Sequence, residues 1–353
     1  MAFKTVLCTL LATALVPELA LGFIVAPVRT SVRMAPADKL SLQPQRKSVH
    51  IQATAAINQN EAKSDLPAWK ASVSKILMQA YIAAMCISLP LTLFPQKLLH
   101  RLGIIDKKRK EHFAVQTGCF CSRWMLRLLP FCNLKTIPSG ESLKEEPEPA
   151  VRVCNHTSML DIFILLAADK SLRGRKKRPI KINYWKHLED NPITKLLFRQ
   201  SGFISIDMED NGSGNANEYN KSTFKALLKD CKLAFSQGFD IGLLPEGQLN
   251  PHPENGLLPI FSGAYTLAKM SSRPIKMMAL SGLHRLWHPN ESIGMTVTSR
   301  DVKVRCYPHG RIYTDADDFK ETFTTVVGQF GATGEDLEAT QLEEWLTGAK
   351  WKR

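Results

Sequence analysis

Strand-like and helix-like segments alternate along residues 150–313, and this alternation restricts the possible folds more than any other feature of the sequence. Short apolar runs such as 240–245 and 274–282 are typical of strands buried on both faces. Segments with helical apolar spacing separate them, so the pattern predicts an α/β domain with a mostly parallel sheet flanked by helices. The predicted strands are 150–154, 178–185, 202–207, 240–245, 274–282 and 301–313, and the predicted helices are 158–170, 191–201, 221–237 and 262–272.

Two targeting signals precede this domain. Residues 1–22 combine one lysine, an apolar stretch and small residues near the end, which is typical of a signal peptide. Residues 23–67 are rich in Ser, Thr, Ala and basic residues, as transit peptides are. Phe23 directly follows the predicted cleavage site, as in the presequences of algal plastids that this segment resembles. This order resembles the bipartite plastid presequence of algae and predicts a plastid envelope membrane. The alternative is ordinary secretory entry, with the protein in the endoplasmic reticulum membrane.

An uncharged apolar segment follows at residues 76–95. It has about the ~20 residues that a bilayer crossing requires, so we expect a transmembrane helix. Basic residues at 107–110 would anchor one end at an anionic surface, and 120–132 has the pattern of an interfacial amphipathic helix. The sequence thus predicts membrane-anchoring helices over 68–139, with a buried or re-entrant hairpin as the alternative for 76–95.

The net charge of the chain indicates which molecules it can bind. The 353-residue chain has a formal net charge of +13, which favours anionic partners such as membrane lipids. No nucleic-acid-binding signature is present, so we expect no nucleic acid partner.

None of the eight cysteines forms a CxxC pair, which predicts free structural thiols. The predicted organisation is 1–22, 23–67, 68–139, a linker at 140–150, the α/β domain at 151–313 and a helical tail at 314–353.

A histidine and a carboxylate interrupt the core-like stretch VRVCNHTSMLDIFILL. His156 falls where a strand meets a helix, and ligands of parallel sheets bind at the carboxyl ends of strands. Asp161, five residues later, can reach back to the imidazole, fix its tautomer and stabilise its charged form. His156 is thus a candidate general base for a hydroxyl that the substrate itself supplies. The alternative is a structural histidine–aspartate pair.

A second polar turn follows the strand-like run at 240–245. Glu246 and Gly247 place a carboxylate and a flexible glycine at the carboxyl end of this strand. Two such turns in one parallel sheet converge on the same edge. We therefore expect Glu246 close to His156, where its carboxylate can hydrogen-bond the hydroxyls of an acceptor.

Four ordered blocks resemble the glycerolipid acyltransferase superfamily, whose best-known members are the 1-acyl-sn-glycerol-3-phosphate acyltransferases. NHTSMLD matches the NHxxxxD signature of that superfamily, and the other blocks follow in the expected order. These are YWKHLEDNPITKLLFRQSGFISID, with Lys186 at the characteristic lysine, then LPEGQ and RPIKMMALSG. The resemblance covers about residues 147–313.

The resemblance implies an O-acyltransferase in which His156 is the general base and Asp161 its partner. Asn155, Lys186, Glu246 and Gly247 would be substrate-binding residues. The implied donor is acyl-CoA or acyl-carrier protein, with no metal or other cofactor. The implied acceptor is a lysophospholipid, 1-acylglycerol-3-phosphate, which gives phosphatidic acid. The alternatives are a different lysolipid acceptor (lysophosphatidylcholine, lysophosphatidylethanolamine or a lysoglycolipid), or a lipid-binding or hydrolytic relative.

Two departures from the family pattern concern the acceptor. The family commonly has arginines where this chain has Met208 and Leu249, the latter after Gln248. These arginines are associated with the phosphate of the acceptor, and their loss removes a strong charge-assisted contact. Lys186, Arg199 or the basic run 173–178 could replace them. We otherwise expect the run 173–178 to form a solvated, lipid-facing loop.

Overall fold

The structure, a computed structural model, describes residues 67–128, 132–139, 148–174, 177–190, 192–206, 221–290 and 300–349. The predicted signal peptide, the predicted transit peptide up to residue 66, most of the predicted linker and Met208 lie outside these residues.

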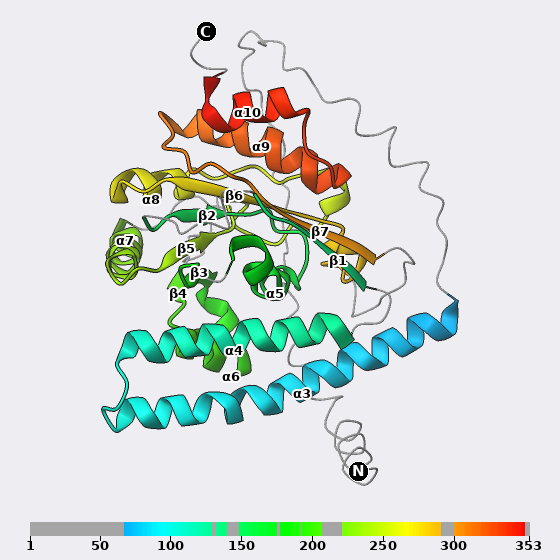
Figure 1. The fold of residues 1–353 in the computed structure, drawn as a ribbon, viewed down its shortest axis with the longest axis vertical. Coiled ribbons are helices and arrows are strands. Elements are labelled where there is room, and N and C mark those ends of the chain that lie inside the picture. The colour runs from blue at the N-terminus through cyan, green and yellow to red at the C-terminus, as the bar shows by residue number, and fades with distance from the viewer. Residues whose placement is uncertain are drawn as a thin grey trace, which may run out of the picture.

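A seven-stranded sheet forms the centre of the described part of the chain, in the order β1-β7-β6-β2-β5-β3-β4 (Figure 1). Every neighbouring pair is parallel except β6 and β7. The predicted fold class is therefore confirmed. The strands are β1 (Cys132–Ile137), β2 (Val151–Val153), β3 (Ile180–Trp185), β4 (Ile204–Ile206), β5 (Asp240–Leu243), β6 (Ile275–Ser281) and β7 (Arg300–Cys306).

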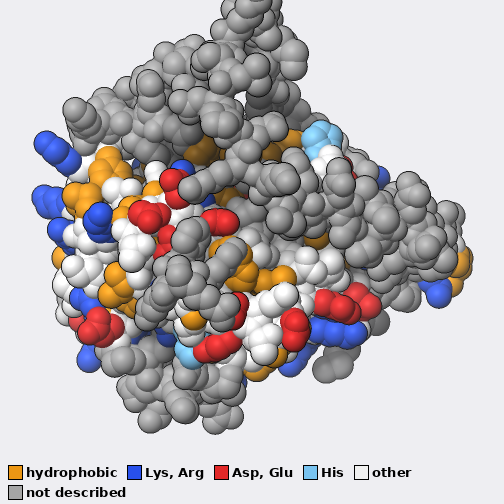
Figure 2. Space-filling view, turned by 90° about the horizontal axis from the view of Figure 1, so that it is seen from above, with side chains coloured by type: hydrophobic (Ala, Val, Ile, Leu, Met, Phe, Trp, Pro, Cys, Tyr) orange, Lys and Arg blue, Asp and Glu red, His pale blue; other side chains and the backbone are white. Residues whose placement is uncertain are grey.

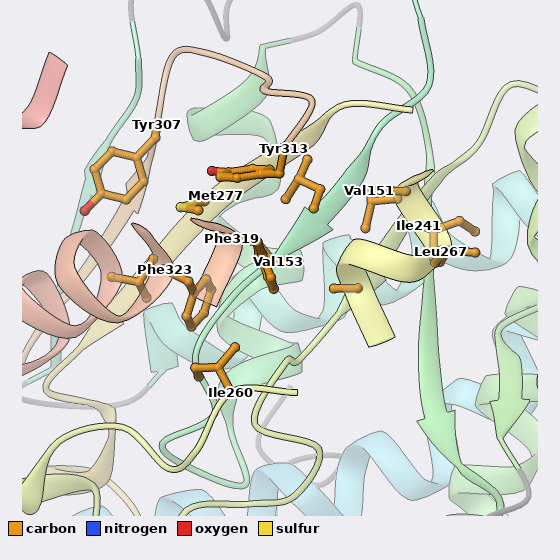
Figure 3. Close-up of a cluster of buried hydrophobic side chains, with 14 of the residues drawn as sticks. Val151, Val153, Ile241, Ile260, Leu267, Met277, Tyr307, Tyr313, Phe319 and Phe323 are labelled. Carbon is orange, nitrogen blue, oxygen red and sulfur yellow. The ribbon is translucent and has the colours of Figure 1, made fainter. Parts of the chain in front are cut away.

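Helices cover both faces of the sheet (Figure 1). The helices on one side are α7 (Lys221–Ser236), α8 (Gly263–Ser271), α9 (Ala316–Thr333) and α10 (Ala339–Thr347). Their apolar side chains join those of the central strands in the largest core cluster, which includes Val153, Met277 and Phe323 (Figure 3). The helices on the other side are α3 (Ala68–Arg101), α4 (Lys107–Leu128), α5 (Asp161–Arg173) and α6 (Pro192–Ser201).

The predicted transmembrane segment 76–95 lies within α3. This 34-residue helix extends beyond the segment at both ends without a break. It packs against α4 and α6. Across the residues that the structure describes, no helix is both long enough and apolar enough to cross a bilayer. The transmembrane helix predicted for residues 76–95 is thus not found in this part of the chain. Residues 120–128 of the predicted interfacial helix 120–132 form the last part of α4, whereas Cys132 begins β1.

The N-terminal helices and the sheet are joined by a buried ion pair. Glu111 of α4 is 2% exposed, and its carboxylate accepts a hydrogen bond of 2.7 Å from Lys181 Nζ of β3. Gly202, with a φ of +66°, leaves room for this carboxylate, because a Cβ there would lie 2.3 Å from Glu111 Cδ. Removing one partner of such a buried pair leaves an uncompensated charge, so the pair fixes α4 against the sheet.

The described residues of the basic run 173–178 do not form the expected solvated loop. Arg173 is buried as the last residue of α5 and donates hydrogen bonds to Asp169 and Asp240. Lys177 pairs with the same Asp169. Two buried carboxylates thus hold Arg173 inside the protein, and one of them also pairs with the partly exposed Lys177, which a composition pattern does not reveal. The prediction of free thiols is confirmed for the six cysteines whose side chains are described.

Candidate active site

Three adjacent parallel strands, β6, β2 and β5, bring polar turns to one edge of the sheet. His156 follows β2, Glu246 follows β5 and His284 follows β6 in the 3₁₀ helix η3 (Leu283–Arg285). Because all three strands run in the same direction, their carboxyl ends place these side chains on a common rim. The predicted convergence of the β2 and β5 turns is therefore present.

His156 and Asp161 form a hydrogen-bonded pair on this rim. His156 Nδ1 lies 2.9 Å from Asp161 Oδ2. The side chain of Asp161 is fully buried, whereas that of His156 is 20% exposed. The ionised carboxylate can only accept, so Nδ1 carries the proton and Nε2 is the basic nitrogen. Within the described part of the chain, Nε2 has no hydrogen-bond partner.

Local backbone geometry holds the carboxylate of Asp161 in place. Oδ2 also accepts hydrogen bonds from the backbone N–H groups of Thr157, at 2.5 Å, and Ser158, at 3.0 Å. Asp161 is the first residue of α5, where the helix dipole favours a negative charge. These contacts compensate for burial of the carboxylate and aim it at the imidazole.

The nucleophilic side chains beside His156 are engaged elsewhere. Burial raises the pKa of the Cys154 thiol well above its ordinary value, an effect to which the charges of Asp161 and Glu246 add. Cys154 is therefore a thiol rather than the nucleophilic thiolate at neutral pH. The hydroxyl of Ser158 is buried and donates to the backbone carbonyl of Trp287 at 2.8 Å. Neither group is positioned for attack by His156-assisted deprotonation.

Asn155 joins two strands of the sheet. Its Nδ2 donates to the carbonyl of Leu280 at 2.9 Å, and its Oδ1 accepts from the N–H of Leu280 at 2.8 Å. The side chain is completely buried. These contacts fix the residue before His156 to β6, so Asn155 acts on the geometry of the rim.

Glu246 is bound directly to the backbone of the histidine. Its Oε1 accepts from the N–H of His156 at 2.6 Å, and its Oε2 accepts from the N–H of Leu258 at 2.9 Å. Burial raises the pKa of this carboxyl, and the two backbone donors oppose that rise. Asn250 reinforces the turn by donating its N–H to the carbonyl of His156. The carboxylate therefore fixes the position of His156.

Gly247 and Lys186 take separate places on the rim. Gly247 has a φ of +72°, and a Cβ there would lie 2.7 Å from ring carbons of Phe261, so the turn needs glycine. Lys186 is exposed at the start of η1 (Lys186–Glu189), directly after β3. Arg199 is engaged by Glu189, with contacts of 2.6 and 3.1 Å.

His284 is a further titratable group at the rim, which the sequence reasoning missed. Burial lowers its pKa to about 4; Arg285 and His288 also lower it, whereas Glu254 and Asp161 raise it. The signal in the sequence is its position three residues after a buried strand, which parallels that of His156.

This lowered pKa predicts a loss of stability in acid. Between pH 6.5 and pH 4 the unfolded chain takes up a proton at His284 that the folded chain refuses, so stability falls as pH falls. The shift corresponds to about 3 kcal/mol at its full extent. We expect His284→Gln to remove this component, so that urea unfolding at pH 7 and pH 4.5 shows a smaller loss for the variant. Equal losses in both proteins would contradict the prediction.

Metal binding has no visible basis in the described residues. Among them, no group of three or more His, Cys, Asp or Glu side chains is arranged to hold a metal ion.

Comparisons with known proteins give a sequence similarity and a shared fold. The family model described as Acyltransferase matches residues 135–281, from β1 to the end of β6. This part of the chain is therefore similar in sequence to acyltransferases. A search of curated proteins finds no match.

One similar solved structure is the 1-acyl-sn-glycerophosphate (LPA) acyltransferase PlsC from Thermotoga maritima. The similarity has a TM-score of 0.52 at 13% identity and covers 74% of this chain and 95% of that chain. The two proteins thus share the fold, including the mostly parallel sheet and its flanking helices.

Proposed function

We propose that this protein is an O-acyltransferase that moves an acyl group from a thioester to the free hydroxyl of a lysophospholipid. The observation that carries the proposal is the His156–Asp161 pair, with Nε2 available at the carboxyl rim of the sheet. The match to the Acyltransferase family over residues 135–281 supports the same reaction class. The proposed donor is acyl-CoA or acyl-carrier protein, and no other cofactor is needed.

The proposed reaction uses the acceptor hydroxyl as the nucleophile. His156 Nε2 takes the hydroxyl proton while the oxygen attacks the thioester carbonyl carbon. The tetrahedral intermediate then collapses, the C–S bond breaks and the thiolate takes the proton from the imidazolium. The charge of Asp161 stabilises the imidazolium between these steps. The engaged states of Cys154 and Ser158 favour this direct transfer over an acyl-enzyme.

The acceptor that we propose is 1-acylglycerol-3-phosphate, with phosphatidic acid as the product. Lys186 follows β3 on this rim with its side chain exposed, and we assign this cation to the phosphate; Arg199 is paired with Glu189. Gln248 and Leu249 lie in the turn after Gly247, where the family pattern has an arginine. This difference favours lysophosphatidylcholine, lysophosphatidylethanolamine or a lysoglycolipid as the alternative acceptor.

We propose that the α3–α4 side of the protein attaches to the membrane surface. Ile87, Leu91, Phe94 and Leu98 are exposed at helical spacing on α3. The first turn of α4 is Lys107–Lys110, and such basic residues attract anionic lipid. Figure 2 views the molecule from the α10 side and shows acidic side chains among basic and apolar ones. Helices α9 and α10 carry five acidic residues against one lysine, so the α3–α4 side is the one suited to anionic lipid.

The location that we propose is the plastid envelope, with the endoplasmic reticulum membrane as the alternative. It rests on the composition of residues 1–67 alone. A fluorescent protein fused after residue 67 would be imported into plastids of an alga with complex plastids. Retention in the endoplasmic reticulum would contradict the plastid assignment.

An acceptor panel tests the proposed reaction. Lysophosphatidate, lysophosphatidylcholine, lysophosphatidylethanolamine and a lysoglycolipid are each supplied with acyl-CoA and with acyl-carrier protein donors. We expect lysophosphatidate to be preferred at least about tenfold, which corresponds to about 1.4 kcal/mol. We also expect Lys186→Gln to raise KM for lysophosphatidate, since it removes the phosphate partner, while Lys195→Gln on the exposed surface of α6 leaves it unchanged.

Two outcomes of this panel would contradict the assignment. A tenfold preference for another lysolipid would replace the acceptor and keep the acyl transfer. Release of free fatty acid at a rate independent of any lysolipid would indicate a hydrolase.

A further inference from the structure

A cavity lies between α4 and α5, away from the His156–Asp161 pair. It has a volume of about 390 Å³ and is lined by His112, Cys119 and Arg123 of α4 and by Asp169 and Lys170 of α5. Lys177, in the connection to β3, also lines it. This cavity takes no part in the reaction proposed above.

The cavity belongs to the opposite edge of the sheet. Asp161 begins α5 at the catalytic rim, and Lys170 lies nine residues further along the helix, about 13 Å at 1.5 Å per residue. Pro179 also lines the cavity and directly precedes β3, whose carboxyl end points to the catalytic rim. A ligand in this cavity is therefore separate from the acceptor at His156.

The walls of the cavity have a surplus of positive charge. Arg123, Lys170 and Lys177 face one carboxylate, that of Asp169. Lys177 shares Asp169 with the buried Arg173. Among the described residues, neither Arg123 nor Lys170 is paired with a carboxylate. Two cations at the wall thus have no acidic partner, and a surplus of this kind in a partly enclosed site attracts anions.

A buried charge network lies behind Asp169, outside the residues that line the cavity. Arg173 donates from Nη1 to Asp240 at 2.9 Å, and Arg152 Nε donates to the same carboxylate oxygen at 2.6 Å. All three side chains are at most 1% exposed. Asp240 is therefore already shared between two guanidinium groups and neutralises none of the cavity's remaining charge. The network holds Arg173, the last residue of α5, in place through Asp169 and Asp240.

The pKa of His112 is lowered in part by the same positive charges. Burial lowers the pKa of this imidazole, and the positive charges of Lys177 and Lys108 lower it further. The histidine is thus neutral at pH 7 and can donate one hydrogen bond without adding charge. Val115 and Leu166 supply apolar surface beside these polar groups.

We propose that the cavity between α4 and α5 binds a phosphate ester, with Arg123, Lys170 and Lys177 as the cations that hold its oxygens. Charge-assisted hydrogen bonds from guanidinium and ammonium groups are the usual contacts of phosphate oxygens. The apolar wall accommodates the ester portion. The phosphate can come from a lipid headgroup, because α4 belongs to the side that we assign to the membrane, or from a soluble phosphate compound.

The test compares two full-length double variants that lose the same charge. Arg123→Gln/Lys170→Gln removes the two unpaired cations of the cavity. Lys229→Gln/Lys232→Gln removes two exposed lysines of α7, on the other side of the sheet. Binding of inorganic phosphate is measured by calorimetry. Binding to phosphatidylcholine vesicles with and without phosphatidate is measured by flotation.

We expect the cavity variant to bind one of these probes about tenfold more weakly than the wild type, while the α7 variant binds like the wild type. Weaker binding of inorganic phosphate indicates a soluble source, and weaker binding of phosphatidate vesicles alone indicates a lipid headgroup. Any phosphate bound near His156 contributes equally to all three proteins. Equal behaviour of the two variants with both probes, or no binding by the wild type, would overturn the proposal.

Discussion

Replacing His156 with alanine is expected to lower kcat for acyl transfer by about 10²–10⁴-fold, because general-base assistance typically contributes that much. The side chain contacts Asp161 and presents Nε2 to the rim, while the contact to Glu246 is made by the backbone N–H, which alanine keeps. Folding should therefore survive. Steady-state kinetics with a thioester donor measures the effect, and the melting temperature and circular dichroism report on the fold.

The exposed pair formed by His309 and Glu343, 3.5 Å apart, provides the matched control. His309→Ala removes the same side chain from a histidine–carboxylate pair outside the candidate site, so its activity should equal that of the wild type. Wild-type turnover in His156→Ala would exclude His156 as the base. An unfolded His156→Ala protein would show instead that the pair is structural.

Asp161→Asn is expected to lower kcat by about 10²–10⁴-fold and to destabilise the protein as well. An amide cannot stabilise the imidazolium as a carboxylate does. Its N–H group can also donate to Nδ1 of His156, which favours the tautomer that has its proton on Nε2 and cannot act as the base. The same carboxylate accepts from two backbone N–H groups at the start of α5. Weakening these buried contacts should cost about 1–3 kcal/mol. Kinetics and urea unfolding measure the two effects separately.

A double variant shows whether the two residues act as one unit. In a His156→Ala background, Asp161→Asn should lower kcat little further, because groups that act together are strongly non-additive. Glu343→Gln, in the exposed pair, should change neither activity nor stability. Full additivity of the two catalytic substitutions would contradict a shared role.

The local part of this architecture could be predicted from the sequence. Apolar runs of strand length alternate with helical spacing, and this pattern gave the central strands β2, β5 and β6 and the helices between them. The approach of Asp161 to His156 was also accessible, since a helix that starts at Asp161 turns its first side chain back towards the preceding residues.

The convergence of the two polar turns could be predicted, but the long-range hydrogen bonds between them could not. Glu246 was expected to contact an acceptor, yet both of its oxygens bind backbone N–H groups, one of them 90 residues away. Asn155 likewise binds Leu280, 125 residues further on. Such contacts depend on strand order, which local periodicity does not encode.

The edge strand β1 and the burial of Arg173 also could not be predicted from the sequence. β1 alternates exposed and partly buried residues, because it lies at the edge of the sheet, so its pattern lacks the apolar run of a central strand. The basic run 173–178 resembles a surface loop by composition. Only the fold reveals that Asp169 and Asp240 lie beside Arg173.

The two hydrogen bonds between the Asn155 side chain and the backbone of Leu280 have a consequence for the synthesis of the chain. A chain still emerging from the ribosome contains His156 and Asp161 long before it contains the strand that holds them. Until residue 280 is synthesised and β6 pairs with β2, the rim lacks one of its walls. The catalytic pair should thus be assembled late, and a chain halted before β6 should carry both residues without activity.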